Sequence, residues 1–268
     1  MFDGGSILTK IYTLVNQKGG VGKTTTTINL GAYLAQIGQR VLVVDLDPQA
    51  NATSCLGVDK LGVLGGTYEA LLGDANVSSY VLLNERLKLS LLPSSPSLAG
   101  AEVELVDELA REMRLRKAIA PLANKYDYVL IDCPPSLGLL TVNGLMAAVD
   151  GVIVPVQCEF LALEGLGQLT QTIERVRSLL FPELVVRGVV LTMFDSRTNL
   201  ANDVVAEVSK HFPDQVFKSI IPRSIRLAEA PSYGLPISVY APTSVGAVAY
   251  EALAKELLKG DEHKSIKH

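Results

Sequence analysis

Residues Lys18 to Thr25 read KGGVGKTT and combine three glycines, two lysines and adjacent threonines. Glycines at 19, 20 and 22 allow backbone torsions that a Cβ atom would block, so consecutive N–H groups can point at one anion. In such a loop Lys23 reaches the β- and γ-phosphates and the Thr24 hydroxyl ligates Mg²⁺. The spacing predicts a loop that binds a nucleoside triphosphate. Its predicted nucleotide-binding residues are Lys18, Gly19, Gly20, Val21, Gly22, Lys23, Thr24 and Thr25.

Three aspartates follow apolar runs elsewhere in the chain. Asp45 ends the run VLVV, and Asp47 comes two residues later. Side chains two apart on an extended segment point the same way, so both carboxylates can face the phosphate loop. Asp132 ends the apolar run in YDYVLID. A carboxylate in that position binds Mg²⁺ directly or through a water.

The apolar runs alternate with amphipathic segments of helical length, which predicts an α/β fold. Several runs are apolar almost throughout, as suits parallel strands buried on both faces. We expect one P-loop NTPase domain over residues 1–268, with a doubly wound, mainly parallel sheet, helices on both faces and the ligand at the carboxyl ends of the strands. Predicted strands are 11–15, 41–45, 87–92, 128–132, 151–155, 185–192 and 216–221. Predicted helices are 24–37, 98–122, 137–148, 161–180, 201–212 and 244–259.

The two ends of the chain are expected to be flexible, over residues 1–9 and 260–268. In the last predicted helix, Val248, Leu253 and Leu257 are expected to share one side.

Composition narrows the function. A formal net charge of −4 argues against a protein that binds nucleic acid with its whole surface. It does not exclude a local basic patch. Cys55, Cys133 and Cys158 have unrelated spacings that fit neither a disulfide framework nor a zinc site. The apolar stretch 133–149 is broken by two prolines and an asparagine, and the N-terminus lacks an apolar signal region, so we expect neither a membrane span nor secretion. The predicted compartment is the cytoplasm.

The phosphate loop departs from the pattern G-x-x-x-x-G-K-[ST], because Gln17 stands at the first Gly and Lys18 opens the loop. This form resembles the deviant Walker A loop of the ParA/MinD superfamily, whose extra lysine reaches across a dimer interface to the partner's nucleotide. DPQANAT, PSLAGAEVEL, QCEFLALEGLGQL, MFDSRTNL and IPRSIRLAEAPSYGLPI are similar to stretches of chromosomal ParA proteins of the Soj type. The likeness runs from Lys10 to about Lys259. Ala50 and Ser224 depart from it, since the family usually has Gly and Asn there.

The resemblance implies ATP and Mg²⁺ as cofactors, and it assigns roles to the residues. The aspartate at position 45 belongs to the Mg²⁺ shell, and the aspartate at position 47 orients the attacking water. The implied residues are, for catalysis, Lys18, Lys23 and Asp47; for Mg²⁺, Thr24, Asp45 and Asp132; for the adenine, Pro222 and Ser224; and for DNA, Arg197, Arg223 and Arg226.

Members of this family bind ATP, close into a nucleotide-sandwich homodimer and then hold DNA without sequence preference, until a ParB-like partner stimulates slow hydrolysis. The resemblance therefore predicts a nucleoid-associated, ATP-dependent DNA-partitioning protein. Residues 187–229 contain six Lys or Arg against five Asp or Glu, so one copy should bind DNA poorly. A dimer doubles the phosphate contacts.

The sequence disfavours four alternative functions. A MinD-like ATPase that cycles on membranes and positions cell division needs a C-terminal amphipathic helix, whereas LAKELLKGDEHKSIKH lacks aromatic residues and has mixed charge. An iron–sulfur ATPase needs cysteine spacings that are not present, and a plasmid repressor needs a helix-turn-helix before Lys18, where there is no room. A purely structural DNA binder would have no use for Asp47 and Asp132. We expect no membrane partner.

Overall fold

The computed structural model describes residues 9–73, 76–159 and 162–265, and a seven-stranded sheet runs through its middle. Across the sheet the order is β3-β4-β2-β5-β1-β6-β7, and every neighbouring pair is parallel except β3 and β4. The predicted doubly wound, mainly parallel sheet is confirmed. The strands are β1 (Lys10–Leu14), β2 (Val41–Asp45), β3 (Leu82–Asn84), β4 (Leu89–Leu92), β5 (Tyr128–Asp132), β6 (Gly151–Gln157) and β7 (Val186–Thr192).

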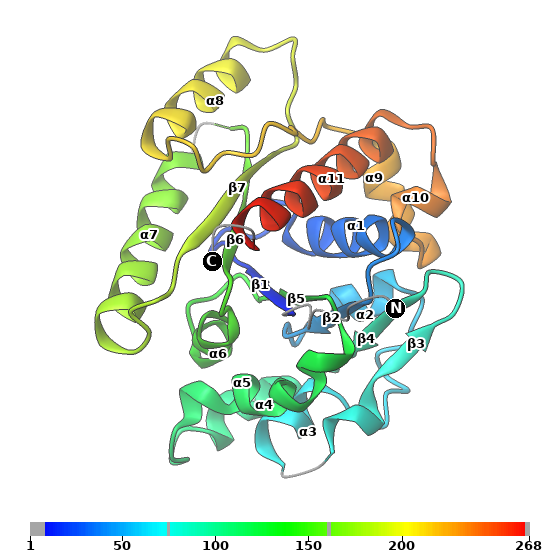
Figure 1. Cartoon of the computed structure of the whole chain (residues 1–268), viewed down its shortest axis with the longest axis vertical. Coiled ribbons are helices and arrows are strands. Elements are labelled where there is room, and N and C mark those ends of the chain that lie inside the picture. The colour runs from blue at the N-terminus through cyan, green and yellow to red at the C-terminus, as the bar shows by residue number, and fades with distance from the viewer. Residues whose placement is uncertain (1–8, 74–75, 160–161, 266–268) are drawn as a thin grey trace, which may run out of the picture.

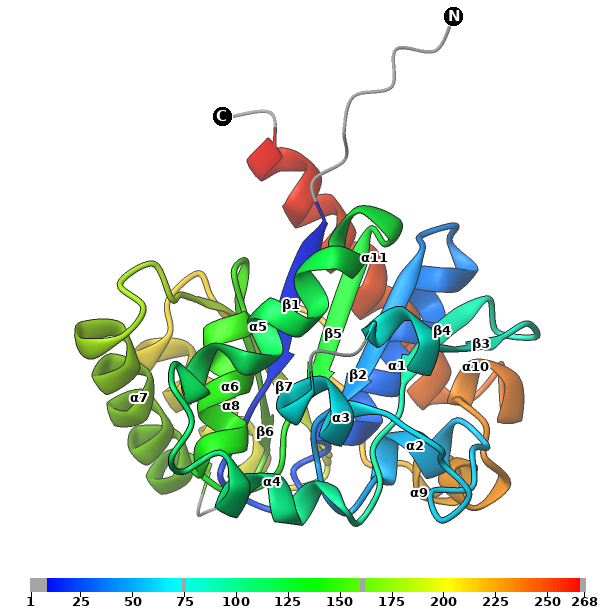
Figure 2. The same ribbon diagram turned by 90° about the horizontal axis from the view of Figure 1, so that it is seen from below.

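Helices cover both faces of the sheet, as Figures 1 and 2 show. On one face lie α1 (Lys23–Gln36), α2 (Asn51–Cys55), α10 (Ile237–Tyr240) and α11 (Val245–Ser265). On the other lie α3 (Thr67–Leu72), α4 (Leu98–Glu104), α5 (Arg114–Ile119), α6 (Leu139–Ala147) and α7 (Ala162–Leu179), with α8 (Asn199–His211) beside α7. The short α9 (Ile225–Glu229) comes after α8 in the chain. Short 3₁₀ helices occur at Val77–Tyr80, Arg111–Met113, Ala120–Lys125 and Ala230–Tyr233.

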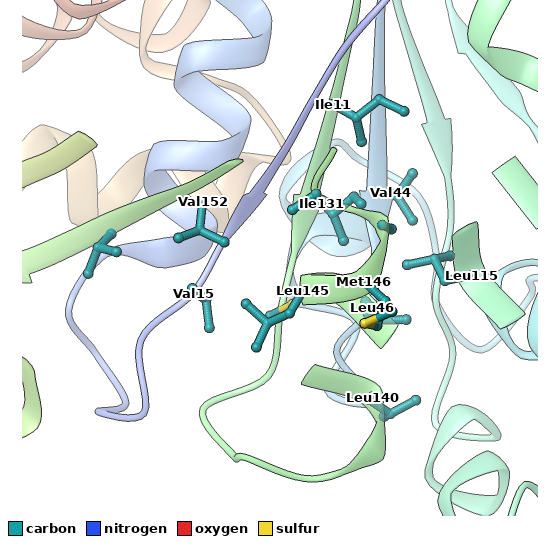
Figure 3. Packing of buried hydrophobic residues seen from close by; sticks show 14 of the residues in the cluster. Ile11, Val15, Val44, Leu46, Leu115, Ile131, Leu140, Leu145, Met146 and Val152 are labelled. Atoms are coloured by element: carbon teal, nitrogen blue, oxygen red, sulfur yellow. The ribbon is translucent and has the colours of Figure 1, made fainter. Parts of the chain in front are cut away.

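An apolar layer fills the space on each side of the sheet. Figure 3 shows part of the layer under α6, where Leu145 and Met146 face Ile131 and Val44 of the strands. β2 and β5 are buried at every residue, because both of their faces carry helices. Their parallel register sets Asp45 beside Asp132. The same edge of the sheet therefore receives both carboxylates and the loop that follows β1.

The predicted helix 98–122 is wrong, because the chain there forms α4, a turn and the shorter α5. Leu98, Ala101 and Leu105 are buried at helical spacing, which is the signal that suggested one long element. At Ala110 the backbone enters the left-handed region with φ 52°, and a regular helix cannot continue through that conformation. Two short helices therefore satisfy the apolar spacing.

The predicted strand 216–221 is also wrong. Val216 forms an isolated parallel bridge to Val189. The N–H groups of Lys218 and Ser219 donate to the Glu256 carboxylate of α11, at 2.8 and 3.0 Å. A side chain on the covering helix thus takes the hydrogen bonds that a neighbouring strand would have received.

The strand predicted over residues 87–92 is β4, which begins at Leu89, two residues later than predicted. Lys88 has a φ of 51° and closes a turn before β4. That turn connects β4 to the antiparallel strand β3, which the sequence did not predict. With only three residues, β3 is too short to show an alternating pattern.

The last helix runs to Ser265, past its predicted end near Lys259. It buries Leu253 and Leu257 against the sheet, whereas Val248 is 60% exposed, so the predicted face that included Val248 is wrong. Five residues turn a helix by roughly 140° beyond a full turn, which places Val248 and Leu253 on different sides. None of the helices in the described ranges has the length and apolar composition needed to cross a bilayer.

The predicted flexible ends are mostly outside the described residues, which exclude 1–8 and 266–268. Thr9 is the first described residue, and its hydroxyl donates to the Tyr126 carbonyl at 2.8 Å. Residues 260–265 belong to α11 instead of a frayed tail.

Asp261 fixes this end of α11 to the sheet. Its side chain is buried and accepts hydrogen bonds from the hydroxyls of Tyr12 (2.8 Å) and Tyr128 (3.1 Å). The Arg187 guanidinium donates two more, at 3.0 and 2.9 Å. Burial, reinforced by the Asp261 charge, raises the pKa of both tyrosines, so their hydroxyls stay protonated and able to donate. One carboxylate therefore joins α11 to β1, β5 and β7.

Asp261→Ala is expected to lower the free energy of unfolding by about 3–5 kcal/mol, because it leaves the largely buried Arg187 guanidinium without its counter-charge. Equilibrium urea unfolding followed by circular dichroism measures the change. The exposed neighbour Glu262 supplies the control, and Glu262→Ala should stay within about 0.5 kcal/mol of the parent. A loss below about 1 kcal/mol for Asp261→Ala would contradict the anchoring role.

Candidate functional site

The loop between β1 and α1 has the backbone that its glycines suggested. Gly20 and Gly22 adopt φ values of 77° and 88°, in the left-handed region that favours glycine. Gly22 directly precedes α1, which begins at Lys23. The Val21 carbonyl accepts a hydrogen bond from the Thr192 hydroxyl at 2.8 Å, which ties the loop to the end of β7. The loop therefore lies over the amino end of a helix, where an anion is favoured.

Asn16 holds the beginning of the loop. Its amide nitrogen donates to the Pro155 carbonyl of β6 at 2.8 Å, and its amide oxygen accepts from the Lys18 N–H at 3.0 Å. The Lys23 ammonium is buried and donates to the Lys18 carbonyl at 3.2 Å. Burial lowers the pKa of Lys23, and attraction to Asp132 opposes that change. The loop is thus closed on itself by its second lysine.

The side chain of Lys18 turns away from its own loop and forms an ion pair with Glu159. The Gln157 amide donates to the other carboxylate oxygen of Glu159 at 2.8 Å. Both charged side chains keep partial contact with solvent, at 31% and 37% exposure. The predicted reach of Lys18 to a second copy stays a prediction.

Asp132 lies at the mouth of the loop and is fully buried. Its carboxylate accepts hydrogen bonds from the hydroxyls of Thr24 at 2.6 Å and Thr27 at 3.1 Å. Burial, followed by repulsion from Asp45, raises the pKa of Asp132 to about 7. The predicted metal ligands Thr24 and Asp132 are therefore in direct contact.

Asp45 is also fully buried, at the end of the neighbouring strand. It accepts hydrogen bonds from the backbone N–H and the hydroxyl of Thr53, each at 2.7 Å. Burial raises the pKa of Asp45 to about 6, and the Thr53 hydrogen bonds oppose the rise. Asp45 and Asp132 interact electrostatically, so the structure brings these two predicted ligands to one place.

Asp47 lies beside this pair, with its backbone N–H 3.2 Å from an Asp45 carboxylate oxygen. Its own carboxylate accepts the Gln49 N–H at 2.9 Å, and its carbonyl accepts the Ser94 hydroxyl at 2.8 Å. Ser94 also donates its N–H to the Thr53 hydroxyl at 2.9 Å. Ser94, in the loop after β4, is therefore joined by two hydrogen bonds to the segment after β2, one to Asp47 in the loop and one to Thr53 in α2.

Ala50, one of the two departures from the family pattern, is buried with a φ of 51°. A glycine adopts this conformation without cost, whereas an alanine is strained there by roughly 1 kcal/mol. The usual glycine of the family thus has a physical reason at this position.

Four residues that the sequence did not predict also support the site: Asn16, Thr53, Ser94 and Glu159. Thr53 could have been found, since it follows the aspartates in DPQANAT. Ser94 follows the apolar run of β4, which ends at the same edge as β2. The other two carry no signal of their own, because a polar side chain beside a loop is common.

The donor set fits a magnesium–nucleotide complex. Among the described residues, no three His, Cys, Asp or Glu side chains converge to form a protein-only metal site. Mg²⁺ usually takes one or two carboxylates, with substrate phosphates and waters as the other ligands. The Thr24 hydroxyl and the Asp132 carboxylate match that need. The buried carboxylate groups of Asp45, Asp47 and Asp132 outnumber the single buried ammonium group of Lys23 by two. A divalent cation would balance the excess.

The residues predicted for the adenine lie after the end of β7. Pro222 forms a parallel bridge to Phe194, and the Arg223 N–H donates to the Phe194 carbonyl at 2.9 Å. Ser224 directly precedes α9. The segment is thereby held beside the strand that also contacts the phosphate loop through Thr192. A base contact by Pro222 or Ser224 stays a prediction.

The three predicted DNA-binding arginines are exposed, and two of them, Arg197 and Arg226, pair with carboxylates of their own chain. Arg197 is 83% exposed and bonds Asp195 at 2.6 Å, while Arg226 bonds Glu229 at 2.9 Å. Hydrogen bonds from Arg197 lower the pKa of Asp195 to about 2, and the charge of Arg223 adds to this. Exposed ion pairs contribute little, so a phosphate can replace these carboxylates.

Comparison with known proteins gives consistent matches over most of the chain. The family described as an AAA domain matches residues 9–186. The sporulation initiation inhibitor protein Soj of Bacillus subtilis is 53% identical over 248 residues, which cover 92% of this chain and 98% of that protein. The chromosome partitioning protein ParA of Myxococcus xanthus is 54% identical, covering 96% of this chain and 90% of that protein. The chromosome-partitioning ATPase Soj of Treponema pallidum is 51% identical, with coverages of 94% and 98%.

Solved structures share the fold. A Mycobacterium smegmatis protein described as cobyrinic acid a,c-diamide synthase, with bound ADP and magnesium, superposes with a TM-score of 0.84. It is 41% identical, and the match covers 95% of this chain and 96% of that one. The septum site-determining protein MinD of Pyrococcus horikoshii, complexed with Mg-ADP, gives a TM-score of 0.74 at 29% identity, over 97% and 99% of the two chains.

Proposed function

We propose that this chain, which belongs to the Soj/ParA family of chromosome-partitioning ATPases, hydrolyses ATP with Mg²⁺ in order to move or space a DNA cargo. The observation that carries this proposal is the contact between the phosphate loop and the end of β5. There the Thr24 hydroxyl donates to the Asp132 carboxylate at 2.6 Å. Relatives that match nearly the whole chain support the same conclusion.

The residues of the site divide the work of phosphoryl transfer. Thr24 and Asp132 would hold Mg²⁺, with Asp45 beside them. The ion would supply positive charge that offsets the charge of the phosphates. Lys23 and the loop N–H groups bind the phosphate oxygens. Asp47 positions the attacking water, but an anion beside an anionic phosphate is a poor base, so turnover is slow.

The proposed ATP-bound state is a homodimer in which Lys18 of each copy reaches the nucleotide of the other. The partly exposed Lys18 side chain supports this arrangement. Apolar side chains are also exposed on the segments that follow β4 and β5, at the edge of the sheet where the phosphate loop lies (Figure 2). They are Val103, Val106, Leu109 and Leu137. Burying such a surface between two copies would stabilise their association.

In this dimer we propose that Arg197, Arg223 and Arg226 bind DNA phosphates, and that a ParB-like partner stimulates hydrolysis and so releases the DNA. Each arginine pairs with, or lies near, a carboxylate of its own chain, which keeps a single copy a weak binder. Two copies present twice as many phosphate contacts, so binding depends on the dimer and hence on ATP.

Arg197→Glu combined with Arg226→Glu is expected to weaken ATP-dependent retention of random-sequence duplex at least tenfold, because four contacts per dimer are lost and reversed in charge. Filter binding at fixed salt measures the effect. Lys117→Glu with Lys255→Glu changes the net charge equally on other, exposed surfaces and serves as the control. Full retention by the arginine variant would show that the patch is misplaced.

One experiment separates this function from a membrane-cycling ATPase. Binding is measured to random-sequence duplex and to anionic lipid vesicles, each with ATP, with ADP and without nucleotide. We expect ATP-dependent retention on duplex and none on vesicles. The burial of Leu253 and Leu257 inside the fold supports this expectation, since α11 uses these apolar side chains against the sheet. Retention on vesicles alone would overturn the proposal.

A further inference from the structure

Glu159 is placed as a defined partner for Lys18 within one chain. β6 ends at Gln157, and a tight turn follows in which the Glu159 N–H donates to the Gln157 carbonyl at 2.8 Å. The Gln157 side-chain amide donates to one carboxylate oxygen of Glu159 at 2.8 Å, and the Lys18 ammonium pairs with the other. Both oxygens of Glu159 are therefore engaged, and its orientation is set by its own strand.

The backbone of Lys18 is fixed independently of this ion pair. Its N–H donates to Asn16 and its carbonyl accepts from Lys23, so the loop keeps its shape on both sides of the residue. The side chain of Lys18 can consequently exchange its partner without any change in the loop. This separation of a fixed backbone from a movable ammonium is what an exchange of partners requires.

We propose that Glu159 is the resting partner of Lys18 in a single copy, and that the phosphates of the partner's nucleotide displace Glu159 when two copies close. This inference rests on the proposed dimer. While Lys18 pairs with Glu159 in its own chain, its positive charge is offset there, which weakens its attraction to a nucleotide held by another copy. Glu159 is thus a positioning residue that keeps Lys18 from acting until a triphosphate is presented to it.

The strength of the pair suits an exchange. Both side chains are about one third exposed, and ion pairs with that much solvent are weak. A nucleotide phosphate enclosed between two copies carries more charge in a drier place, so it competes well for the ammonium. The pair therefore opposes closure without preventing it, and because a dimer contains two such pairs, the opposition counts twice.

Glu159→Gln removes the charge and keeps the size of the side chain. It should lower the dissociation constant of the dimer about 2- to 30-fold, which is the effect of removing two exposed ion pairs. Sedimentation of the full chain with Mg²⁺ and a non-hydrolysable ATP analogue measures this constant. Glu159→Asp keeps the charge and should fall between the parent and Glu159→Gln. Glu183→Gln, at an exposed carboxylate outside the site, should lie within about twofold of the parent.

Two further readouts distinguish this role from a general effect of charge near the nucleotide. Nucleotide affinity measured on dilute single copies should change less than twofold in Glu159→Gln. Rising salt should bring the parent and the variant together, because screening weakens the pair in the parent. A change in single-copy affinity as large as the change in dimerisation, or a salt-independent difference, would overturn the inference.

Comparison with Lys18→Ala keeps this inference apart from the proposed dimer. If Lys18→Ala fails to dimerise and Glu159→Gln dimerises like the parent, Glu159 has no such role and the proposed function stands. If Lys18→Ala dimerises normally, the proposed action of Lys18 on the partner's nucleotide is wrong and the role of Glu159 is lost with it.

Discussion

Lys18→Ala is expected to weaken ATP-dependent dimerisation at least 100-fold and to leave nucleotide binding by single copies within about twofold of the parent. The proposed dimer contains two contacts between a lysine and a partner's phosphate, and each charged hydrogen bond contributes about 1.5–3 kcal/mol. Removing both costs enough to separate the copies at micromolar concentration. Within its own loop Lys18 contributes through backbone groups, which alanine keeps.

Gel filtration with light scattering, at several protein concentrations with Mg²⁺ and ATP, measures the dimer. Fluorescent-nucleotide titration of dilute protein measures binding by single copies. Lys255→Ala, an exposed lysine of α11, is the matched control and should dimerise normally. A dimer of Lys18→Ala at the parent's concentration would rule out the contact between copies.

Asp47→Ala is expected to reduce the rate of ATP hydrolysis about 100-fold while nucleotide binding persists. A misplaced water costs roughly this much, since the reacting groups must be aligned for the displacement. The fold should survive, because Ser94 is held by the carbonyl of Asp47 and not by its carboxylate. With hydrolysis blocked, dimers bound to DNA should accumulate.

Phosphate release and duplex retention, measured on the same samples, test both parts of this expectation. Asp59→Ala removes an exposed carboxylate from the loop after α2 and is the control. Hydrolysis by Asp47→Ala at the parent's rate would show that another group positions the water.

The sequence was sufficient for the parts of the site that lie at strand ends. Asp45 and Asp132 follow buried apolar runs, and parallel strands bring their carboxyl ends to one edge, so their meeting could be predicted. The ends of β2 and β5 agree with the predicted ends at those residues.

Features that depend on contacts distant in sequence could not be predicted. The segment 216–221 has the composition of a strand, yet the N–H groups of Lys218 and Ser219 donate to Glu256 of α11 instead of to a neighbouring strand. The break at Ala110 depends on a left-handed backbone that alanine rarely adopts. The pairing of Lys18 with Glu159 joins residues 141 positions apart, and no local pattern marks it.

Ser94 connects the segment that follows β2, at the predicted nucleotide site, to the segment that follows β4. Because it grips both the Asp47 carbonyl and the Thr53 hydroxyl, the loop after β2 cannot be displaced without pulling the loop after β4 or breaking two hydrogen bonds. That second loop leads directly into α4. In the proposed dimer, departure of the terminal phosphate would thus be transmitted to the exposed side chains of Val103, Val106 and Leu109, where the other copy would bind.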